Sequence, residues 1–228
     1  MNTQLMQNDL LRRLAKSDPV TYDRLLDDLQ PTPLERGGVL GAARERIHWA
    51  YFVDSGVVSL VGETKGGQSL EVAAVGKEGV AGFSDALGGR GLPYRLVVHL
   101  PGLAYRIRTD VVKAHVFSCT PLHELLMGYS QFVMHQLAVS AVCSRFHGSV
   151  QRLARWLLQA SERAGTIRLQ LTHELLAQMV GAPRSAVTAA AAELRAGRII
   201  DYERGVLTIR NAKRLHAKSC DCIDLMRY

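Results

Sequence analysis

Residues 171–211 read LTHELLAQMVGAPRSAVTAAAAELRAGRIIDYERGVLTIRN, and the fold of the C-terminal part follows from this stretch. Thr172 is a typical helix N-cap, and Gly181 can take the left-handed conformation that ends a helix. Pro183 then opens a second helix, which has small and branched apolar residues on one face and stops at Gly197. Two helices joined by a short turn that contains glycine predict a helix-turn-helix.

The residues after the second helix predict a short β-hairpin. Residues 199–202 and 206–209 are rich in apolar side chains, and Glu203-Arg204-Gly205 lies between them as a turn. A hairpin in this place is the wing of a winged helix-turn-helix, with Arg204 at its tip. In such a motif the second helix enters the major groove of DNA. The alternative is a helical hairpin with a solvated basic face, which leaves the ordered caps, turn glycine and hairpin unexplained.

The first turns of the second helix carry the side chains that groove entry needs. Arg184 can bind a guanine edge through two hydrogen bonds, and Ser185 and Thr188 can reach a base or a phosphate. Other residues of the motif are better placed for phosphates, which fix orientation without reading sequence. These are Thr172, His173, Arg195, Arg198 and Arg204.

The positive charge of the chain is concentrated in this region. The 228 residues carry a formal net charge of +7. Residues 148–228 hold 13 Lys and Arg against 7 Asp and Glu, whereas residues 1–147 hold 15 against 14. Such an asymmetry is expected when one part of a chain meets a polyanion, so it agrees with DNA as the partner.

A long helix is predicted to begin at Thr120-Pro121, where a capping hydroxyl precedes a proline at the first helical position. Apolar residues then alternate by three and four, as in the seam of a coiled coil, and predict a homodimer. A second stripe, Leu126, Val133 and Leu137, would pack on the β domain of the same chain. The alternative is a helix buried inside one monomeric domain. The predicted dimer seam is Leu122, Leu125, Tyr129, Phe132, Gln136, Val139 and Cys143.

The rest of the chain predicts helices around a set of short strands. Residues 8–29 predict two short helices, and residues 148–165 predict another amphipathic helix. From residue 34 to 107 the apolar period is two, with turn signals at 54–56, 65–67 and 101–102. Short antiparallel strands at this spacing predict a sandwich or roll.

The cysteines give no sign of a metal site at the level of sequence. Cys119, Cys143, Cys220 and Cys222 lack paired C-x-x-C spacing, so free thiols and no bound metal are expected. His115 and His123 stand four residues on either side of Cys119, but Pro121 interrupts that helix. The N-terminus does not resemble a signal peptide, and no run of eighteen apolar residues occurs. A cytoplasmic protein that does not enter the membrane is expected.

The sequence resembles the Crp/Fnr superfamily of bacterial transcription factors. The resemblance rests on residues 171–209, on FVDSGVVSLV at 52–61 and on the glycine-rich run at 76–89. It implies an α+β chain with an N-terminal β jelly-roll sensor domain at 1–119, which resembles cyclic-nucleotide-binding domains. A dimerisation helix at 120–147 and a winged helix-turn-helix at 148–228 would follow. It also implies a homodimer on palindromic double-stranded DNA, RNA polymerase as a further partner, and a small-molecule effector.

Departures from the family pattern leave the operator and the effector open. Ser185 stands where members commonly carry an acid, and Ala189 where they carry a later arginine. The Gly-Glu segment that grips a cyclic nucleotide is missing, and Pro93-Tyr94-Arg95 replaces Arg-Ser or Arg-Thr, so cyclic AMP is disfavoured. The candidate effector residues are Phe83, Tyr94 and Arg95.

Other chemistry has less support. An iron-sulfur cluster is disfavoured because residues 1–118 contain no cysteine and the positions of the four cysteines make their convergence improbable. One alternative is an effector-independent regulator whose roll is a scaffold. Another is a metal enzyme of the cupin type, but the strands offer only His48 and His99 with scattered glutamates. No nucleophile-base motif or phosphate loop occurs, so the chain is not expected to be an enzyme.

Overall fold

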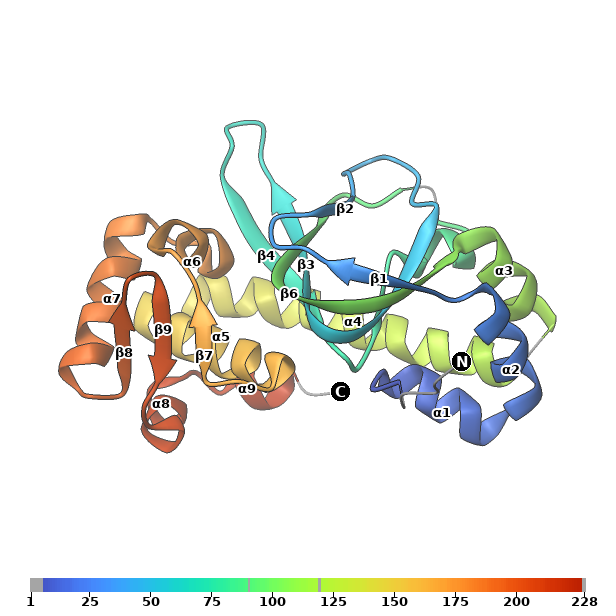
Figure 1. The fold of residues 1–228 in the computed structure, drawn as a ribbon. Helices are drawn as coiled ribbons and strands as arrows, with labels where there is room; N and C mark the ends of the chain where they lie inside the picture. Colours follow the sequence, from blue (N-terminus) through green and yellow to red (C-terminus); the bar gives the residue numbers. More distant parts are fainter. Residues whose placement is uncertain (1–5, 90, 119, 227–228) are drawn as a thin grey trace. The chain divides into compact units, whose positions relative to one another are not determined.

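The structure is a computed structural model that describes residues 6–89, 91–118 and 120–226 (Figure 1). The described residues fall into two compact units. One is drawn from residues 1–61 and 74–133, and the other from residues 62–73 and 134–228. Within the described ranges, no helix combines the length and apolar character needed to cross a membrane.

Two short helices open the first unit, as the sequence predicts: α1 (Asp9–Ser17) and α2 (Pro19–Asp28). Asn8 caps α1 and is fully buried. Its Oδ1 accepts a hydrogen bond from the Leu11 N–H, and its amide donates to the carbonyls of Val53 and Gly79, each at 2.8 Å. One side chain therefore both starts the helix and fixes it to the β-rich part of the unit.

One antiparallel sheet in the order β1-β6-β3-β4, with β2 paired to β6 and β5 to β3, supplies the strands of the first unit, and residues 62–73 at its β3–β4 end belong to the second unit. The long strands β3 and β6 lie side by side at its centre (Figure 1). A short 3-10 helix, η1 (Phe83–Leu87), follows β5. The strands are β1 (Gln30–Leu34), β2 (Val39–Gly41), β3 (Trp49–Glu63), β4 (Ser69–Val75), β5 (Val80–Ala81) and β6 (Arg95–Arg108).

Two of the three predicted turns are wrong, because β3 and β6 continue through them. The register of β3 on β6 shifts between Val53 and Val58 without either strand ending. At this bulge a Cβ on Gly56 would lie 2.6 Å from the Leu100 carbonyl oxygen, and one on Gly102 would overlap the Ser55 carbonyl. The glycines therefore allow two backbones to cross closely within a strand pair. The third turn is confirmed between β3 and β4, where Gly67 has a φ of +80°.

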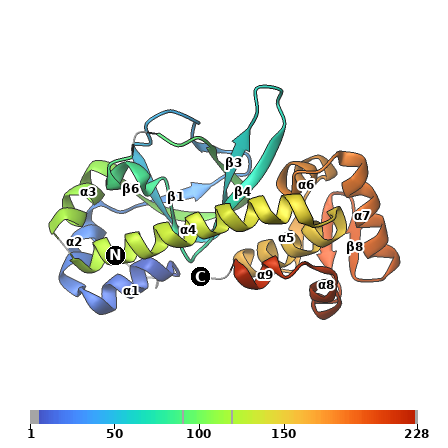
Figure 2. The same cartoon turned by 180° about the vertical axis from the view of Figure 1, so that it is seen from behind.

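Two helices follow the sheet. The sequence did not predict α3 (Thr109–Ser118), whereas α4 (Thr120–Phe146) begins at the predicted residue. Figure 2 shows α4 as one continuous helix. It belongs to both units, since the boundary between them falls after Val133.

The second unit contains the predicted amphipathic helix, α5 (Ser149–Ala164), which packs against α6, α7 and α8. A three-stranded sheet in the order β7-β9-β8 completes it. The C-terminal helices α8 and α9 were not predicted. The remaining elements are β7 (Arg168–Gln170), α6 (His173–Val180), α7 (Arg184–Ala196), β8 (Ile200–Glu203), β9 (Val206–Ile209), α8 (Ala212–Lys218) and α9 (Cys222–Leu225).

Candidate nucleic-acid interface

The predicted helix-turn-helix is confirmed in α6 and α7. Thr172 caps α6, since its Oγ1 accepts a hydrogen bond from the Leu175 N–H at 3.1 Å. Gly181 ends α6 in the left-handed region with a φ of +61°. Pro183 precedes the first residue of α7, Arg184, and leaves a turn of three residues between the helices. Thr172 is exposed but its hydroxyl oxygen is already used in the cap.

The two faces of α7 differ in the way that groove entry requires. Its inner face is buried and consists of small or branched side chains, which allow close packing on α5 and α6. Arg184, Ser185 and Thr188 are exposed on the other face, and the Arg184 side chain is 71% exposed. Arg184 has one weak tie, an ion pair of 3.9 Å to exposed Glu174. The buried residues are Val187, Ala190, Ala191 and Leu194.

His173, a predicted phosphate contact, is engaged within the motif itself. The His173 ring lies 4.7 Å from the Tyr202 ring, and its Nδ1 atom is 3.0 Å from Thr188 Oγ1. Its Nε2 atom is buried without a hydrogen-bond partner. Through these two contacts His173 positions Thr188 and the wing. The sequence could not show this, because the three residues lie in α6, α7 and β8.

The wing is a tight two-residue hairpin. Glu203 pairs with Val206 across the end of β8 and β9, and Arg204 and Gly205 both have positive φ, 49° and 78°. Two central residues with positive φ make a type I′ turn, whose twist matches that of the flanking strands. Arg204 is exposed at the tip, as predicted. The Tyr202 hydroxyl donates to the Leu171 carbonyl at 2.7 Å and so joins the wing to the start of the motif.

Arg195 shares an acidic partner with an arginine that sequence reasoning missed. Asp201 lies 3.7 Å from Arg195 Nε and accepts a hydrogen bond of 3.0 Å from Arg210. The Arg210 hydrogen bond, with a smaller effect from the charge of Arg195, lowers the pKa of the Asp201 carboxyl. Both arginine side chains remain more than half exposed, so they can still face a phosphate. Arg198, another predicted phosphate contact, is exposed with a φ of 54°.

The predicted dimer seam on α4 is wrong, because this chain already covers that face. In the first unit, Tyr129 is fully buried and its ring lies 5.5 Å from that of Phe83. In the second unit, buried Gln136 accepts a hydrogen bond from Arg163, and Cys143 lies 3.6 Å from Cys220. Six of the seven predicted residues are buried in the chain itself: Leu122, Tyr129, Phe132, Gln136, Val139 and Cys143. Leu125 is only partly covered.

A different face of α4 is exposed and has the same heptad spacing. Met134 is 61% exposed and Phe146 is 72% exposed, and Met127 and Val142 are also open. Exposed residues step along this face by four and three, which is the spacing of a coiled-coil seam. They are Met127, Gln131, Met134, Ala138, Ala141 and Arg145.

Two of the three candidate effector residues line one cavity of the first unit. Phe83 and Tyr94 border it together with Leu96 and Val133, and its volume is about 80 Å³. Burial raises the pKa of Tyr94 to about 12. Arg95 is not among the lining residues described, in agreement with strand alternation. The cavity is several times smaller than ordinary small-molecule sites of roughly 300–1,000 Å³.

A larger and polar hollow of about 440 Å³ lies elsewhere in the first unit. It is lined by Arg46, His48, Arg108 and Lys113, with Asp85 and Asp110 as the acidic residues. Arg108 is held by Asp110 through two hydrogen bonds of 3.0 and 2.6 Å. This hydrogen-bonded contact lowers the pKa of Asp110. No pattern in the sequence indicated the hollow, because its residues come from three separate segments.

The expectation that the cysteines stay apart is also wrong. Cys143, Cys220 and Cys222 are buried together and form no disulfide. A hydrogen bond shared with Cys220 lowers the pKa of Cys143 to about 5 and raises that of Cys220. The group of His115, Cys119 and His123, from which no metal site was expected, includes a residue outside the described ones. His48 and His99, which a cupin-type enzyme would need, are not part of the metal-ligating group identified among the described residues.

Comparison with known proteins agrees with this geometry. Residues 151–218 match the Crp-like helix-turn-helix domain family. A search of curated proteins found no match. The whole fold is similar to FixK2 from Bradyrhizobium japonicum, with a TM-score of 0.72 at 14% identity over 84% of this chain and 98% of that one.

Two further solved structures have the same fold. One is the c-di-GMP responsive global regulator CLP from Xanthomonas campestris, and the other is TTHB099, a CRP-family transcriptional regulator from Thermus thermophilus. Each gives a TM-score of 0.67 at 16% identity, over 84% of this chain and 99% of the other. At these identities the likeness establishes the fold.

Proposed function

Residues 151–218 form a Crp-like helix-turn-helix domain, and from this premise we propose that the chain is a cytoplasmic, sequence-specific DNA-binding transcription regulator of the Crp/Fnr type. It would bind a palindromic operator as a homodimer and act on transcription by RNA polymerase. The α7 helix would lie in the major groove. The wing would lie against the phosphate backbone.

The exposed tip of α7 carries this proposal. Arg184 and Ser185 occupy the first turn of the helix, and Thr188 follows one turn later on the exposed side. Arg184 is held only by a long, exposed ion pair to Glu174, so its guanidinium can turn to the two acceptors of a guanine edge. Arg204 and Arg198 are exposed for phosphate contacts. The excess of basic residues over 148–228 supports a polyanionic partner.

We propose that the homodimer forms through the exposed face of α4 rather than through the seam expected from sequence. Met127, Met134 and Ala141 follow one another at intervals of seven residues and give this face an apolar stripe of about four helical turns. An apolar stripe at heptad spacing on a long helix is stabilised by a second copy of the same stripe. Two α7 helices paired in this way would read half-sites about 34 Å apart.

We propose that a signal molecule, where the first unit takes one, is an anion bound in the polar hollow near Arg46 and Lys113. The cavity beside Tyr94 has too little volume for a cyclic nucleotide. An effector-independent regulator is the alternative. Thermal unfolding with phosphate, sulfate and cyclic AMP separates them, because a ligand that binds the folded state raises the midpoint. If the midpoint of thermal unfolding stays the same with every compound, the result supports an effector-independent regulator whose β-roll serves only as a scaffold.

The function itself is tested by selecting bound duplexes from a random library with the full chain. We expect enrichment of a two-fold symmetric sequence with half-sites one helical turn apart. The R184A variant should enrich a site that is relaxed at one position of each half. If the full chain enriches no sequence at moderate salt, the proposal fails.

A further inference from the structure

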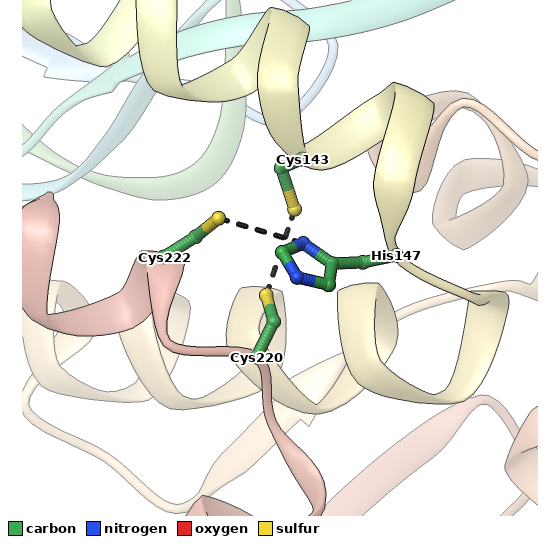
Figure 3. A group of neighbouring side chains, drawn as sticks. All are labelled: Cys143, His147, Cys220 and Cys222. Carbon is green, nitrogen blue, oxygen red and sulfur yellow. Dashed lines mark hydrogen bonds between the residues drawn. The ribbon is translucent and has the colours of Figure 1, made fainter.

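Four side chains capable of binding metal converge in the second unit. Cys143 lies in the last turn of α4 and His147 follows directly after its end, and Cys220 and Cys222 flank Asp221 at the start of α9. The thiols of the three cysteines are buried, and the His147 side chain is 20% exposed. Figure 3 shows the four side chains directed toward a common centre, although 77 residues separate Cys143 from Cys220.

The distances within this group suit a single metal ion. The Sγ atoms of Cys143 and Cys220 are 3.6 Å apart, and Cys222 Sγ is 3.5 Å from His147 Nδ1. All four ligand atoms lie within 4.8 Å of one another. Two sulfurs bound tetrahedrally to zinc at about 2.3 Å would be separated by about 3.8 Å. An iron-sulfur cluster has several irons and sulfides between its ligands and needs a wider group.

We propose that Cys143, His147, Cys220 and Cys222 form a tetrahedral zinc site that fastens the C-terminal segment to the end of α4. Three thiolates and one imidazole make a closed structural site, with no open position for a substrate. Thiolate ligands select zinc over magnesium and calcium, which take oxygen ligands. On binding, each protonated thiol releases its proton to solvent, and His147 donates the Nδ1 lone pair.

Asp221 supports this assignment as a positioning residue. Its Oδ1 lies 3.5 Å from His147 Nε2, on the opposite side of the ring from the Nδ1 atom that faces Cys222. A metal-bound histidine characteristically donates its other N–H to a carboxylate, which fixes the tautomer and the ring orientation. The arrangement therefore includes both the ligands and a carboxylate placed beside one of them, on the side where it can orient the ring.

A cluster of apolar thiols is the simpler explanation, and Val139 and Met226 do pack around the three cysteines. It does not account for an imidazole nitrogen directed at Cys222 or for the carboxylate behind it. A metal also explains how α9, a helix of four residues, is held against the rest of the unit. A structural zinc ion contributes its binding energy to folding.

The test is the metal content of the full chain purified without added metal, measured by mass spectrometry. We expect about one zinc per chain in the unaltered protein and a fall of at least roughly tenfold in C220S and H147Q. The matched control is H135Q, which changes an exposed histidine of α4 and should keep its zinc. The D221N variant should retain the ion but bind it roughly 10–100-fold more weakly.

Two measurements keep the proposal testable if those variants fold poorly. H147C replaces one zinc ligand with another and should restore the zinc that H147Q loses. Cobalt(II) added to the unaltered, zinc-depleted protein should give the intense visible bands of tetrahedral thiolate coordination. Absence of metal from the purified protein and of these bands overturns the proposal. Iron with sulfide, or a Cys143–Cys220 disulfide in reduced preparations, also overturns it.

Discussion

The Nδ1 atom of His173 lies 3.0 Å from Thr188 Oγ1, so the first residue of α6 holds a side chain on the exposed face of α7. The same ring lies against Tyr202 of the wing. One half-buried histidine thus joins the three parts of the motif.

Replacing His173 tests this role. We expect H173A to lower the free energy of unfolding by about 1–2 kcal/mol, because it removes a ring contact and a hydrogen bond. H173F keeps the ring contact and should lose about half as much. Chemical denaturation measures both, with H216A on the exposed surface of α8 as a control that changes little. Full stability in H173A would contradict the assignment.

R184A tests base recognition. We expect the variant to lose about 1–3 kcal/mol of discrimination at one base pair of each half-site, since the two donors of the guanidinium are gone. Competition binding with operators altered at single positions measures the loss. An equal drop in affinity for every sequence would instead make Arg184 a phosphate contact.

R204A tests the wing. The slope of log affinity against log salt concentration should become shallower by about 0.9 for each lost phosphate contact, and the preferred site should stay the same. Titrations at several salt concentrations give the slope. E203Q, at the neighbouring exposed residue of the hairpin, serves as a comparison without loss of a cation. An altered site preference would show that Arg204 reads sequence.

M134E tests the exposed face of α4 as the dimer interface. A charge in the middle of an apolar seam should leave single chains in sedimentation experiments, and the affinity for a palindromic site should fall on the order of 10²-fold. M134L is the matched control, because it keeps an apolar side chain of similar volume at the same position of the seam. A dimer that persists in M134E excludes this interface.

Local signals predicted the helix-turn-helix and its wing. Thr172, Gly181 and Gly205 specify a cap, a helix end and a turn within a few residues, and each lies where expected. The spacing of apolar residues alone could not show which of the two heptad stripes of α4 is exposed and available for a dimer interface. The stripe through Tyr129 packs in its own chain, and the less apolar one through Met134 is left exposed.

The features that the sequence did not predict depend on contacts between residues that are far apart in the chain. A turn was expected at Gly56 because glycine usually marks one, but its role is set by β6, nearly fifty residues later. The convergence of Cys143 with Cys220 depends on how α8 and α9 fold back toward the end of α4. Neither relationship leaves a periodic pattern or a short motif in the sequence.

The close crossing of β3 and β6 makes Gly56 and Gly102 a single steric unit. Each glycine lies against main-chain atoms of the opposite strand. Unlike a side chain, these atoms cannot change rotamer to make room for a Cβ. Even an alanine at either position would push the strands apart. Making room for a side chain at one of the two glycines would still leave no room for one at the other. An engineered version of this domain has to preserve both glycines together or redesign the whole strand pair.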